Sequence, residues 1–170
     1  GETVLKKILV LSDIHGISSR AVHALRTHPE YGTVCFLGDG IRQISLLKKE
    51  HPRTWHIVRG NCDLSSDGDY PEEALIEAEG NRIFLTHGHR YFVKRGEDHL
   101  LAAAAERGAD IVLYGHTHIP AAHYDAAHGV YLFNPGSIGA PYDGNFTYGL
   151  LTISGTNVLF SIGKEALGNK

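Results

Sequence analysis

The sequence predicts a mixed α/β fold in which two β-sheets pack face to face and helices cover their outer faces. Three observations lead to this fold class. Short apolar runs alternate with helical stretches in the first third of the chain, a hairpin and one more helix follow, and only strand-like runs remain after Ile119. With 170 residues, of which 42% are hydrophobic, we expect a single domain over residues 1–170.

Three apolar runs in the first third are typical of buried strands, and they lie within residues 6–16, 33–40 and 54–63. Residues 18–29 and 41–52 between them have helical spacing. Ser18 or Ser19 can cap the first helix. The inner face of the second helix is expected to contain Ile41, Ile44, Leu47 and Ser45. This order predicts a parallel sheet with right-handed crossovers.

The rest of the chain has a different pattern. Residues 72–89 predict a hairpin that turns at Gly80 and Asn81, and residues 97–108 predict an Ala-rich helix that stops at a glycine. Another buried strand follows in residues 109–118. The last third contains apolar runs separated by glycine-rich turns, and we expect it to form a mostly antiparallel sheet. The loops "LSSDGDYP" and "GAPYDGNF" are candidates for a substrate rim, although ordinary surface turns have the same composition.

Composition and charge limit the classes of function. The chain has 16 Lys and Arg against 19 Asp and Glu, so no positive field favours a nucleic acid or a membrane surface. No apolar run approaches the length of a membrane span. Two cysteines cannot form a disulfide framework, and no secretory leader is evident, so a cytoplasmic protein is expected. Gly1, in a chain with no methionine, is interpreted as an expression remnant, and the residues near it are given no functional weight.

Polar side chains follow five of the predicted strands where each strand ends. Because ligands of open α/β sheets bind outside the carboxyl ends of the strands, we expect these side chains to converge. Asp13 and His15 are two residues apart, and so are His116 and His118. In extended backbone this spacing turns both side chains of a pair to the same side. Neighbouring glycines at positions 38, 60, 88 and 115 permit tight turns and the close approach of a bound group. The predicted metal ligands are Asp13, His15, Asp39, Asn61, His87, His116 and His118.

Each of these residues alone has an ordinary explanation, since Asp and Asn after a strand usually form turns or caps and a lone histidine is usually structural. The whole set at successive strand ends favours a metal site. It exceeds the needs of one tetrahedral ion, so two ions are predicted, with the carboxylate of Asp39 as the bridge. Mixed histidine nitrogen and Asp or Asn oxygen suits manganese, iron, cobalt, nickel or zinc better than calcium or magnesium, and manganese is the expected metal.

The motifs "DIHG", "GDG", "GNCD", "THGH" and "GHTH" resemble, in order and spacing, the motif blocks of the calcineurin-like metallophosphoesterase superfamily. The motif "NPGS" resembles a signature of its small bacterial and archaeal phosphodiesterase branch. The resemblance implies a four-layer α/β/β/α sandwich. It assigns one ion to Asp13, His15, Asp39 and His118, and the other to Asp39, Asn61, His87 and His116.

This resemblance implies a phosphoesterase, most simply a phosphodiesterase acting on a small phosphoester. Hydroxide that bridges two divalent ions would attack phosphorus in line, and no protein nucleophile is needed. His89 is expected to face the site and assist the phosphate, and Arg59 and Arg90 are weaker candidates for the same role. The sequence leaves open whether the chain forms a homo-oligomer, and it favours neither a nucleic-acid nor a membrane partner.

Other functions were weighed against this one. Amidohydrolases with an H-x-H motif need a barrel of roughly 250 residues, and this chain is too short. The metallo-β-lactamase arrangement wants an aspartate and a histidine soon after the pair, whereas here the chain continues from His118 into a strand. The alternative from another class is a non-catalytic scaffold or regulatory module, as in the retromer subunit that resembles this family. A scaffold is expected to have lost ligands, and here every ligand position is filled.

Cys62 occupies a position where many members of the superfamily carry a histidine, proposed to protonate the leaving oxygen. We expect its side chain to point away from the ions and not to serve as a ligand, and a disulfide with the buried Cys35 is not expected in the cytosol. A thiol is a weak hydrogen-bond donor. The substitution therefore predicts poor activity on alkyl monoesters and better activity on diesters or good leaving groups.

Overall fold

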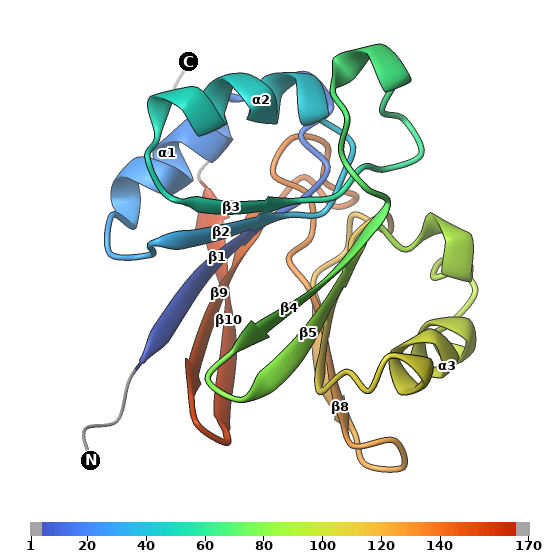
Figure 1. Ribbon diagram of the computed structural model, residues 1–170. Helices are drawn as coiled ribbons and strands as arrows, with labels where there is room; N and C mark the ends of the chain where they lie inside the picture. The colour runs from blue at the N-terminus through green and yellow to red at the C-terminus, as the bar shows by residue number, and fades with distance from the viewer. Residues whose placement is uncertain (1–4, 166–170) are drawn as a thin grey trace.

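The computed structural model describes residues 5–165, which form two five-stranded sheets and three α-helices. Sheet A has the strand order β10-β9-β1-β2-β3, and sheet B has the order β4-β5-β6-β8-β7. Helices α1 and α2 cover the outer face of sheet A, and α3 covers that of sheet B (Figure 1). The predicted mixed α/β fold with two packed sheets is confirmed. Residues 1–4, which include the expected expression remnant, lie outside the described residues.

The elements have the following bounds. The helices are α1 (Ser19–Thr27), α2 (Ile41–Glu50) and α3 (Asp98–Glu106), with two short 3-10 helices, η1 (Ser65–Asp67) and η2 (His89–Tyr91). The strands are β1 (Lys6–Leu11), β2 (Thr33–Phe36), β3 (Thr54–Ile57), β4 (Glu73–Ala78), β5 (Asn81–Thr86), β6 (Ile111–Leu113), β7 (Ala121–Asp125), β8 (Val130–Asn134), β9 (Phe146–Ser154) and β10 (Asn157–Glu165). Within this described part, no helix has the length and apolar character needed to cross a membrane.

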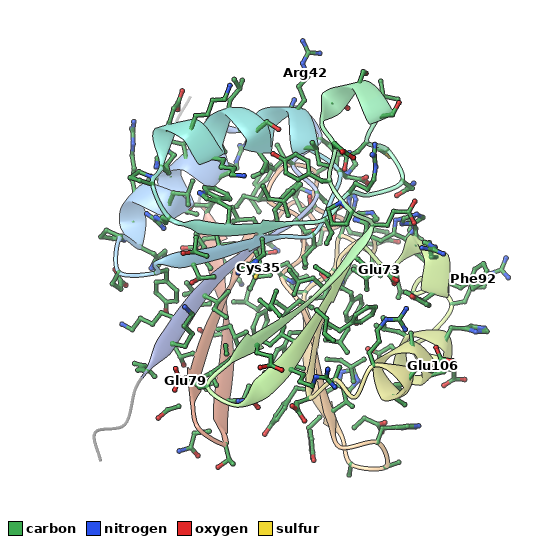
Figure 2. All side chains as sticks on the ribbon, viewed as in Figure 1. Cys35, Arg42, Glu73, Glu79, Phe92 and Glu106 are labelled. Carbon is green, nitrogen blue, oxygen red and sulfur yellow. The ribbon has the colours of Figure 1, made fainter. Side chains whose placement is uncertain are left out.

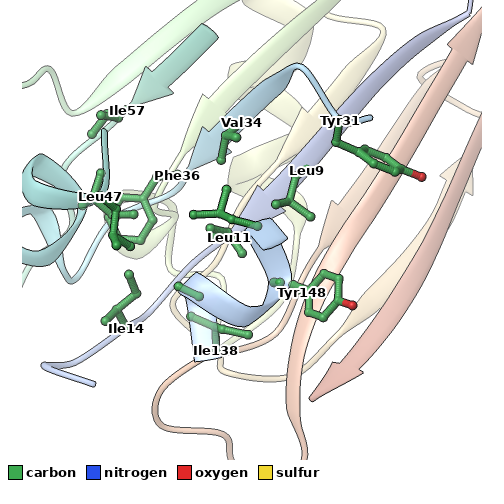
Figure 3. Close-up of a cluster of buried hydrophobic side chains, with 14 of the residues drawn as sticks. Leu9, Leu11, Ile14, Tyr31, Val34, Phe36, Leu47, Ile57, Ile138 and Tyr148 are labelled. Carbon is green, nitrogen blue, oxygen red and sulfur yellow. The ribbon is translucent and has the colours of Figure 1, made fainter. Parts of the chain in front are cut away.

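Three layers of apolar side chains hold the sandwich together. One packs between sheet A and helices α1 and α2, where Leu11, Phe36 and Ile138 meet (Figure 3). A second lies between the two sheets and includes Cys35 (Figure 2), and a third lies between sheet B and α3. The strands at the centre of each sheet are therefore buried on both faces, which explains why they appear in the sequence as continuous apolar runs.

The first three strands and two helices follow the predicted pattern. β1 pairs in parallel with β2, and β2 pairs in parallel with β3. On α2, Ile41, Ile44 and Leu47 are buried as expected, whereas Ser45 is only partly buried. Ser18 stands at the start of α1, but its side chain forms no capping hydrogen bond.

The last third of the chain differs from the prediction, because it does not form a sheet of its own. β7 and β8 complete sheet B, where β8 pairs in parallel with β6, and β9 and β10 complete sheet A, where β9 pairs antiparallel with β1. Without β9 and β8, the N–H and C=O groups along one edge of β1 and one edge of β6 would be buried without hydrogen-bond partners. The late strands supply those partners.

The hairpin of β4 and β5 turns one residue earlier than predicted. Glu79 and Gly80 occupy the turn with φ of 49° and 80°, and Asn81 already belongs to β5. The Asn81 amide donates to the carbonyl oxygens of Glu79 and Gly155, so this side chain supports the turn from outside it. Helix α3 ends just before Gly108, as the sequence predicts, and Gly108 has a φ of 62°.

Candidate metal centre

The loops that follow β1, β2, β5 and β6 meet at one end of the sandwich, so both sheets contribute to the site. Asp13, Asp39 and His87 lie at its base and are almost completely buried, with exposed fractions of 0%, 3% and 0%. One potential ligand atom from each of these three lies within 4.8 Å of the other two. Residues that are far apart in sequence therefore converge, as the strand-end pattern predicts.

One group of donors surrounds Asp13. Its Oδ1 lies 3.2 Å from His118 Nε2 and 3.4 Å from His15 Nε2, and the two histidine nitrogens are 3.2 Å apart. This group combines one buried carboxylate with two half-exposed imidazoles. It faces solvent on the histidine side.

A second group surrounds His87. The Nε2 atom of His87 lies 3.2 Å from Asp39 Oδ2 and 3.2 Å from His116 Nδ1. Asp39 Oδ2 is also 3.6 Å from His15 Nε2, so this oxygen lies between the two groups. Asn61 is exposed on the loop after β3, and its role as a ligand stays a prediction.

Neither the first pair, Asp13 and His15, nor the second pair, His116 and His118, has the extended backbone that was expected from its spacing. Asp13, His15, His116 and His118 all have positive φ, between 48° and 72°. The members of the second pair consequently point to different places, His116 toward His87 and His118 toward Asp13. The extended backbone expected for His116 and His118 is therefore wrong, because the chain turns there, but both side chains still reach one centre, in which His87 Nε2 lies 3.8 Å from Asp13 Oδ1.

Backbone carbonyls fix the orientation of two of the histidine rings. His87 Nδ1 donates to the carbonyl oxygen of Leu37 at 2.7 Å, and His118 Nδ1 donates to that of Ala140 at 2.5 Å. A carbonyl only accepts, so Nδ1 carries a proton in both rings, and Nε2 is the nitrogen that faces the carboxylates of the donor groups. Such a second hydrogen bond is a usual feature of metal-binding histidines.

The electrostatics of the site favour bound cations. Burial acts to raise the pKa of Asp13, but hydrogen bonds from His118 and His15 outweigh it and hold the pKa well below its usual range. The pKa of Asp39 is lowered against burial by its hydrogen bond with His87. Burial and the neighbouring charge of His87 lower the pKa of His116 to about 4. Carboxylates held in their ionised form beside several imidazole nitrogens form a donor set that suits divalent transition metals.

Asp63, to which the sequence analysis gave no role, organises the loop that carries Asp39. Its Oδ2 accepts the backbone N–H groups of Asp39 and Gly60, each at 2.8 Å. Its Oδ1 accepts those of Gly40 and Ile41 at 2.8 and 3.0 Å, at the start of α2. A carboxylate at a helix N-terminus is a favourable arrangement. The sequence signal was an acidic residue in the "GNCD" motif.

The "NPGS" motif supports the loops after β1 and β6. Ser137 Oγ donates to the carbonyl oxygen of Asp13 at 2.7 Å and accepts the N–H of Ala140 at 2.7 Å. Asn134 Nδ2 donates to the carbonyl oxygen of Gly115 and to Thr117 Oγ1. The motif therefore ties both ligand loops together without presenting a ligand itself.

Close packing explains two of the glycines beside the ligands. A Cβ atom on Gly115 would lie 2.2 Å from Ser12 Oγ and 2.9 Å from Asp13 Oδ2, and one on Gly60 would lie 2.2 Å from Asp39 Oδ1. The sequence analysis expected such glycines to make room for a bound group. Here they make room for the ligand-bearing residues themselves.

The remaining predicted residues lie around this centre in different ways. The ring of His89 faces it, with centroids 5.5 Å from His87 and 6.0 Å from His116, and among the described residues its buried Nδ1 has no hydrogen-bond partner. Arg59 donates to the carbonyl oxygen of Asp63, and Arg90 pairs with Glu72 at 2.8 Å. Each arginine head thus has a partner that is not one of the predicted ligands.

Cys62 is placed differently from the prediction. It was expected to point away from the ligands, but its Sγ lies within 4.8 Å of potential ligand atoms of His15 and Asp39. The reason is the turn after β3, in which the N–H of Cys62 donates to Asp39 Oδ1 at 2.8 Å. Burial and the negative charge of Asp39 raise the pKa of the thiol. Both Cys35 and Cys62 are free thiols.

Two hollows adjoin the centre. The large pocket, of about 590 Å³, is bounded by His116, His118, Ile119 and Tyr142 among others. The small pocket, of about 230 Å³, is bounded by residues that include His15, Asp39, Cys62 and Leu64. Tyr142 and Leu64 belong to the two loops singled out as a substrate rim, and both loops do border hollows beside the donor groups.

The family model of the calcineurin-like phosphoesterase superfamily domain matches residues 7–156, which include every predicted ligand. The chain belongs to the calcineurin-like phosphoesterase superfamily. It is 33% identical over 137 residues to the probable metallophosphoesterase YsnB of Bacillus subtilis, covering 79% of this chain and 76% of that protein. It is 30% identical over 172 residues to the phosphodiesterase YfcE of Escherichia coli K12, covering 86% and 88%.

Solved structures of the superfamily share the fold. A predicted phosphoesterase from Streptococcus pneumoniae superposes with a TM-score of 0.81 at 28% identity, over 96% of this chain and 91% of that one. Vacuolar protein sorting 29 from Cryptosporidium parvum superposes with a TM-score of 0.78 at 19% identity, over 96% and 100%. The likeness to the sorting protein concerns the fold alone.

Proposed function

We propose that this chain hydrolyses small phosphate esters, in particular diesters, with two divalent metal ions held between the ends of its two sheets. The observation that carries the proposal is the position of Asp39 Oδ2, 3.6 Å from His15 Nε2 and 3.2 Å from His87 Nε2. A carboxylate between two groups of imidazole donors suits a bridge between two ions. The identity to metallophosphoesterases that extends over most of the chain supports the same reaction class.

The ligand assignment follows the two donor groups. Asp13, His15, Asp39 and His118 would hold one ion, and the other would be held by Asp39, Asn61, His87 and His116. When bound, two such ions acidify a water molecule for attack on phosphorus and neutralise the charge of the phosphoryl oxygens. Manganese is the expected metal, with iron, zinc, nickel and cobalt as alternatives.

His89 is proposed to orient the substrate. Burial and the charge of His87 lower its pKa, so the ring is neutral at pH 7 and carries one proton. Its Nδ1 is buried and has no partner in the described part of the chain. A hydrogen bond from that nitrogen to a phosphoryl oxygen would satisfy it and hold the phosphate against the centre.

Cys62 is proposed to limit the range of leaving groups. Its position beside Asp39 brings the thiol to the edge of the centre, and its raised pKa keeps it protonated at neutral pH. A protonated thiol donates hydrogen bonds only weakly. The chain would therefore favour esters whose leaving group needs little protonation, such as activated diesters.

Metal analysis combined with an activity assay tests the proposal. The chain is stripped with chelator, reloaded with Mn²⁺, and assayed on bis(p-nitrophenyl) phosphate and on p-nitrophenyl phosphate. We expect about two equivalents of metal, metal-dependent hydrolysis and a preference for the diester. A protein that binds no metal and stays inactive with each divalent cation would refute the proposal that the chain is an enzyme.

A scaffold function is the second candidate, since a vacuolar sorting protein has the same fold, with a TM-score of 0.78. The same assay separates the two candidates, since a scaffold needs no turnover. The intracellular location is proposed to be the cytoplasm, where free thiols such as those of Cys35 and Cys62 persist.

A further inference from the structure

The large pocket begins at the metal centre and extends away from it along sheet B. Two of its lining residues, His116 and His118, are predicted metal ligands. Its volume of about 590 Å³ falls within the range of sites for small organic ligands. A phosphate group bound at the centre would leave most of this space for the group attached to it.

The walls beyond the ligands are largely apolar. Val93 and Ala121 line the pocket, and two larger side chains, Ile119 and Tyr142, are 48% and 80% exposed beside it. Large apolar side chains exposed around a hollow are typical of a binding site. An aromatic ring such as that of Tyr142 offers a face on which a flat ligand can stack.

The charges in the pocket distinguish its two ends. Glu97 accepts a hydrogen bond from the hydroxyl of Tyr114 at 2.9 Å and lies 2.9 Å from His123 Nε2, so its carboxylate already has two partners. Lys94 is exposed at the pocket, and its charge acts on His116. Lys94 therefore adds positive charge near the centre, whereas the carboxylate of Glu97 is already engaged by Tyr114 and His123.

We propose that the large pocket binds one ester group of the substrate, and that this group is an uncharged aromatic ring lying against Tyr142 and Ile119. Lys94 lies toward the phosphate end and attracts its oxygens. The inference rests on the proposed function and names the substrate class of the same site, a phosphodiester with at least one aryl or similarly flat ester group.

Binding of phosphonates to the Mn²⁺-loaded protein, measured by calorimetry, tests the pocket without any turnover. Methylphosphonate, cyclohexylphosphonate and phenylphosphonate carry the same anionic head on organic groups of different shape. We expect phenylphosphonate to bind about tenfold more tightly than methylphosphonate, a difference of about 1.4 kcal/mol. Cyclohexylphosphonate is expected to fall between them.

Variants assign this preference to the pocket. In Tyr142→Ala and Ile119→Ser, the ratio of the phenyl to the methyl affinity should fall at least threefold, while methylphosphonate still binds. Lys94→Met should weaken both ligands by a similar factor. Leu46→Ser removes an apolar side chain of 60% exposure on α2, outside the pocket, and should leave the ratio unchanged.

Equal affinity for the methyl and phenyl compounds in the unmodified protein would overturn the proposal, and so would a ratio that neither pocket variant changes. Equal affinity for the cyclohexyl and phenyl compounds would refute its aromatic part. Turnover of bis(p-nitrophenyl) phosphate is measured on the same samples. Its absence would count against the proposed function, whereas the phosphonate ratio still reports on the pocket.

Discussion

Asp63 accepts a hydrogen bond of 2.8 Å from the backbone N–H of Asp39, the residue that lies between the two donor groups. Asp39 itself has a φ of 65°, a backbone conformation that non-glycine residues seldom adopt. The same carboxylate holds the N–H of Gly60 at 2.8 Å, on the loop that carries Asn61. Two ligand loops are thus positioned by one side chain that is not itself a ligand.

Replacing Asp63 should weaken metal binding without removing a ligand. Asp63→Ala leaves four backbone N–H groups without their charged acceptor, and we expect a loss of about 2 kcal/mol in the free energy of unfolding. Mn²⁺ affinity should fall at least tenfold. Urea denaturation with chelator measures the first effect, and calorimetric titration with Mn²⁺ measures the second.

Asp67→Ala is the matched control for that variant. Asp67 is an acidic residue of the same loop, but its carboxylate accepts the N–H of Leu64 and not that of a ligand-bearing residue. Mn²⁺ affinity should be unchanged. Equal loss of affinity in Asp63→Ala and Asp67→Ala would show that general loop stability, and not the contact with Asp39, is responsible.

Removing the Asp39 carboxylate should abolish hydrolysis and the binding of two ions together. Its Oδ2 is close to histidines of both donor groups, so Asp39→Ala deprives both of an anionic ligand. Asp39→Asn keeps the shape of the side chain and should also lose activity, because an amide lacks the charge. Near-normal turnover in either variant would contradict the bridging role.

Gly115→Ala tests the close packing around Asp13. The added Cβ would lie 2.2 Å from Ser12 Oγ, so the loop after β1 must shift. We expect a loss of about 1 to 3 kcal/mol in stability and a marked loss of metal affinity. Gly32→Ala is the control, since no atom lies within 4 Å of a Cβ at that position. Unchanged metal affinity in Gly115→Ala would show that the loop adapts.

Cys62→His should change the response to the leaving group. Imidazole is a better proton donor than a thiol at neutral pH, and general acid catalysis contributes roughly 10² to 10⁴ in rate. Hydrolysis of alkyl esters should therefore improve more than hydrolysis of p-nitrophenyl esters. The measurement is kcat/KM over a series of leaving groups. Equal changes across the series would reject a role for this position in protonation.

Stability should depend on pH through His56 on β3. Burial and the charge of Lys6 lower its pKa in the folded state. The unfolded chain therefore binds a proton more readily, so the contribution of His56 is present above pH of about 6.5 and is lost as the pH falls below that value. Urea denaturation in chelator should show a shallower decline between pH 7 and 5 for His56→Gln. The exposed His99→Gln should keep the slope of the unmodified chain.

The convergence of the predicted ligands could be anticipated because Asp13, Asp39, His87 and His116 follow apolar strands closely, and strand ends of packed sheets meet. The direction of each side chain could not, since it depends on left-handed backbone at residues such as His116 and His118. Spacing alone predicts an extended backbone, which this pair does not have, so the different donor groups that the two rings reach could not be predicted from it.

Supporting residues were harder to predict than ligands. Ser137 contacts the carbonyl oxygen of Asp13 across 124 positions of the chain, and no local pattern indicates that partner. The same applies to Cys62, whose approach to Asp39 depends on a turn fixed by Asp63. The division of the last strands between two sheets also depends on which interior edges need partners, and this is decided only when the whole chain packs.

The pairing of β1 with β9 has a consequence for the order in which the molecule is made. β1 is synthesised first, but it lies between β2 and β9, and β9 spans Phe146–Ser154. A nascent chain that has emerged only as far as His118 contains every predicted ligand but lacks the Ser137 contact to Asp13 and one neighbour of β1. The support of Asp13 by Ser137 and the completion of sheet A around β1 therefore both depend on residues that are synthesised after the last predicted ligand.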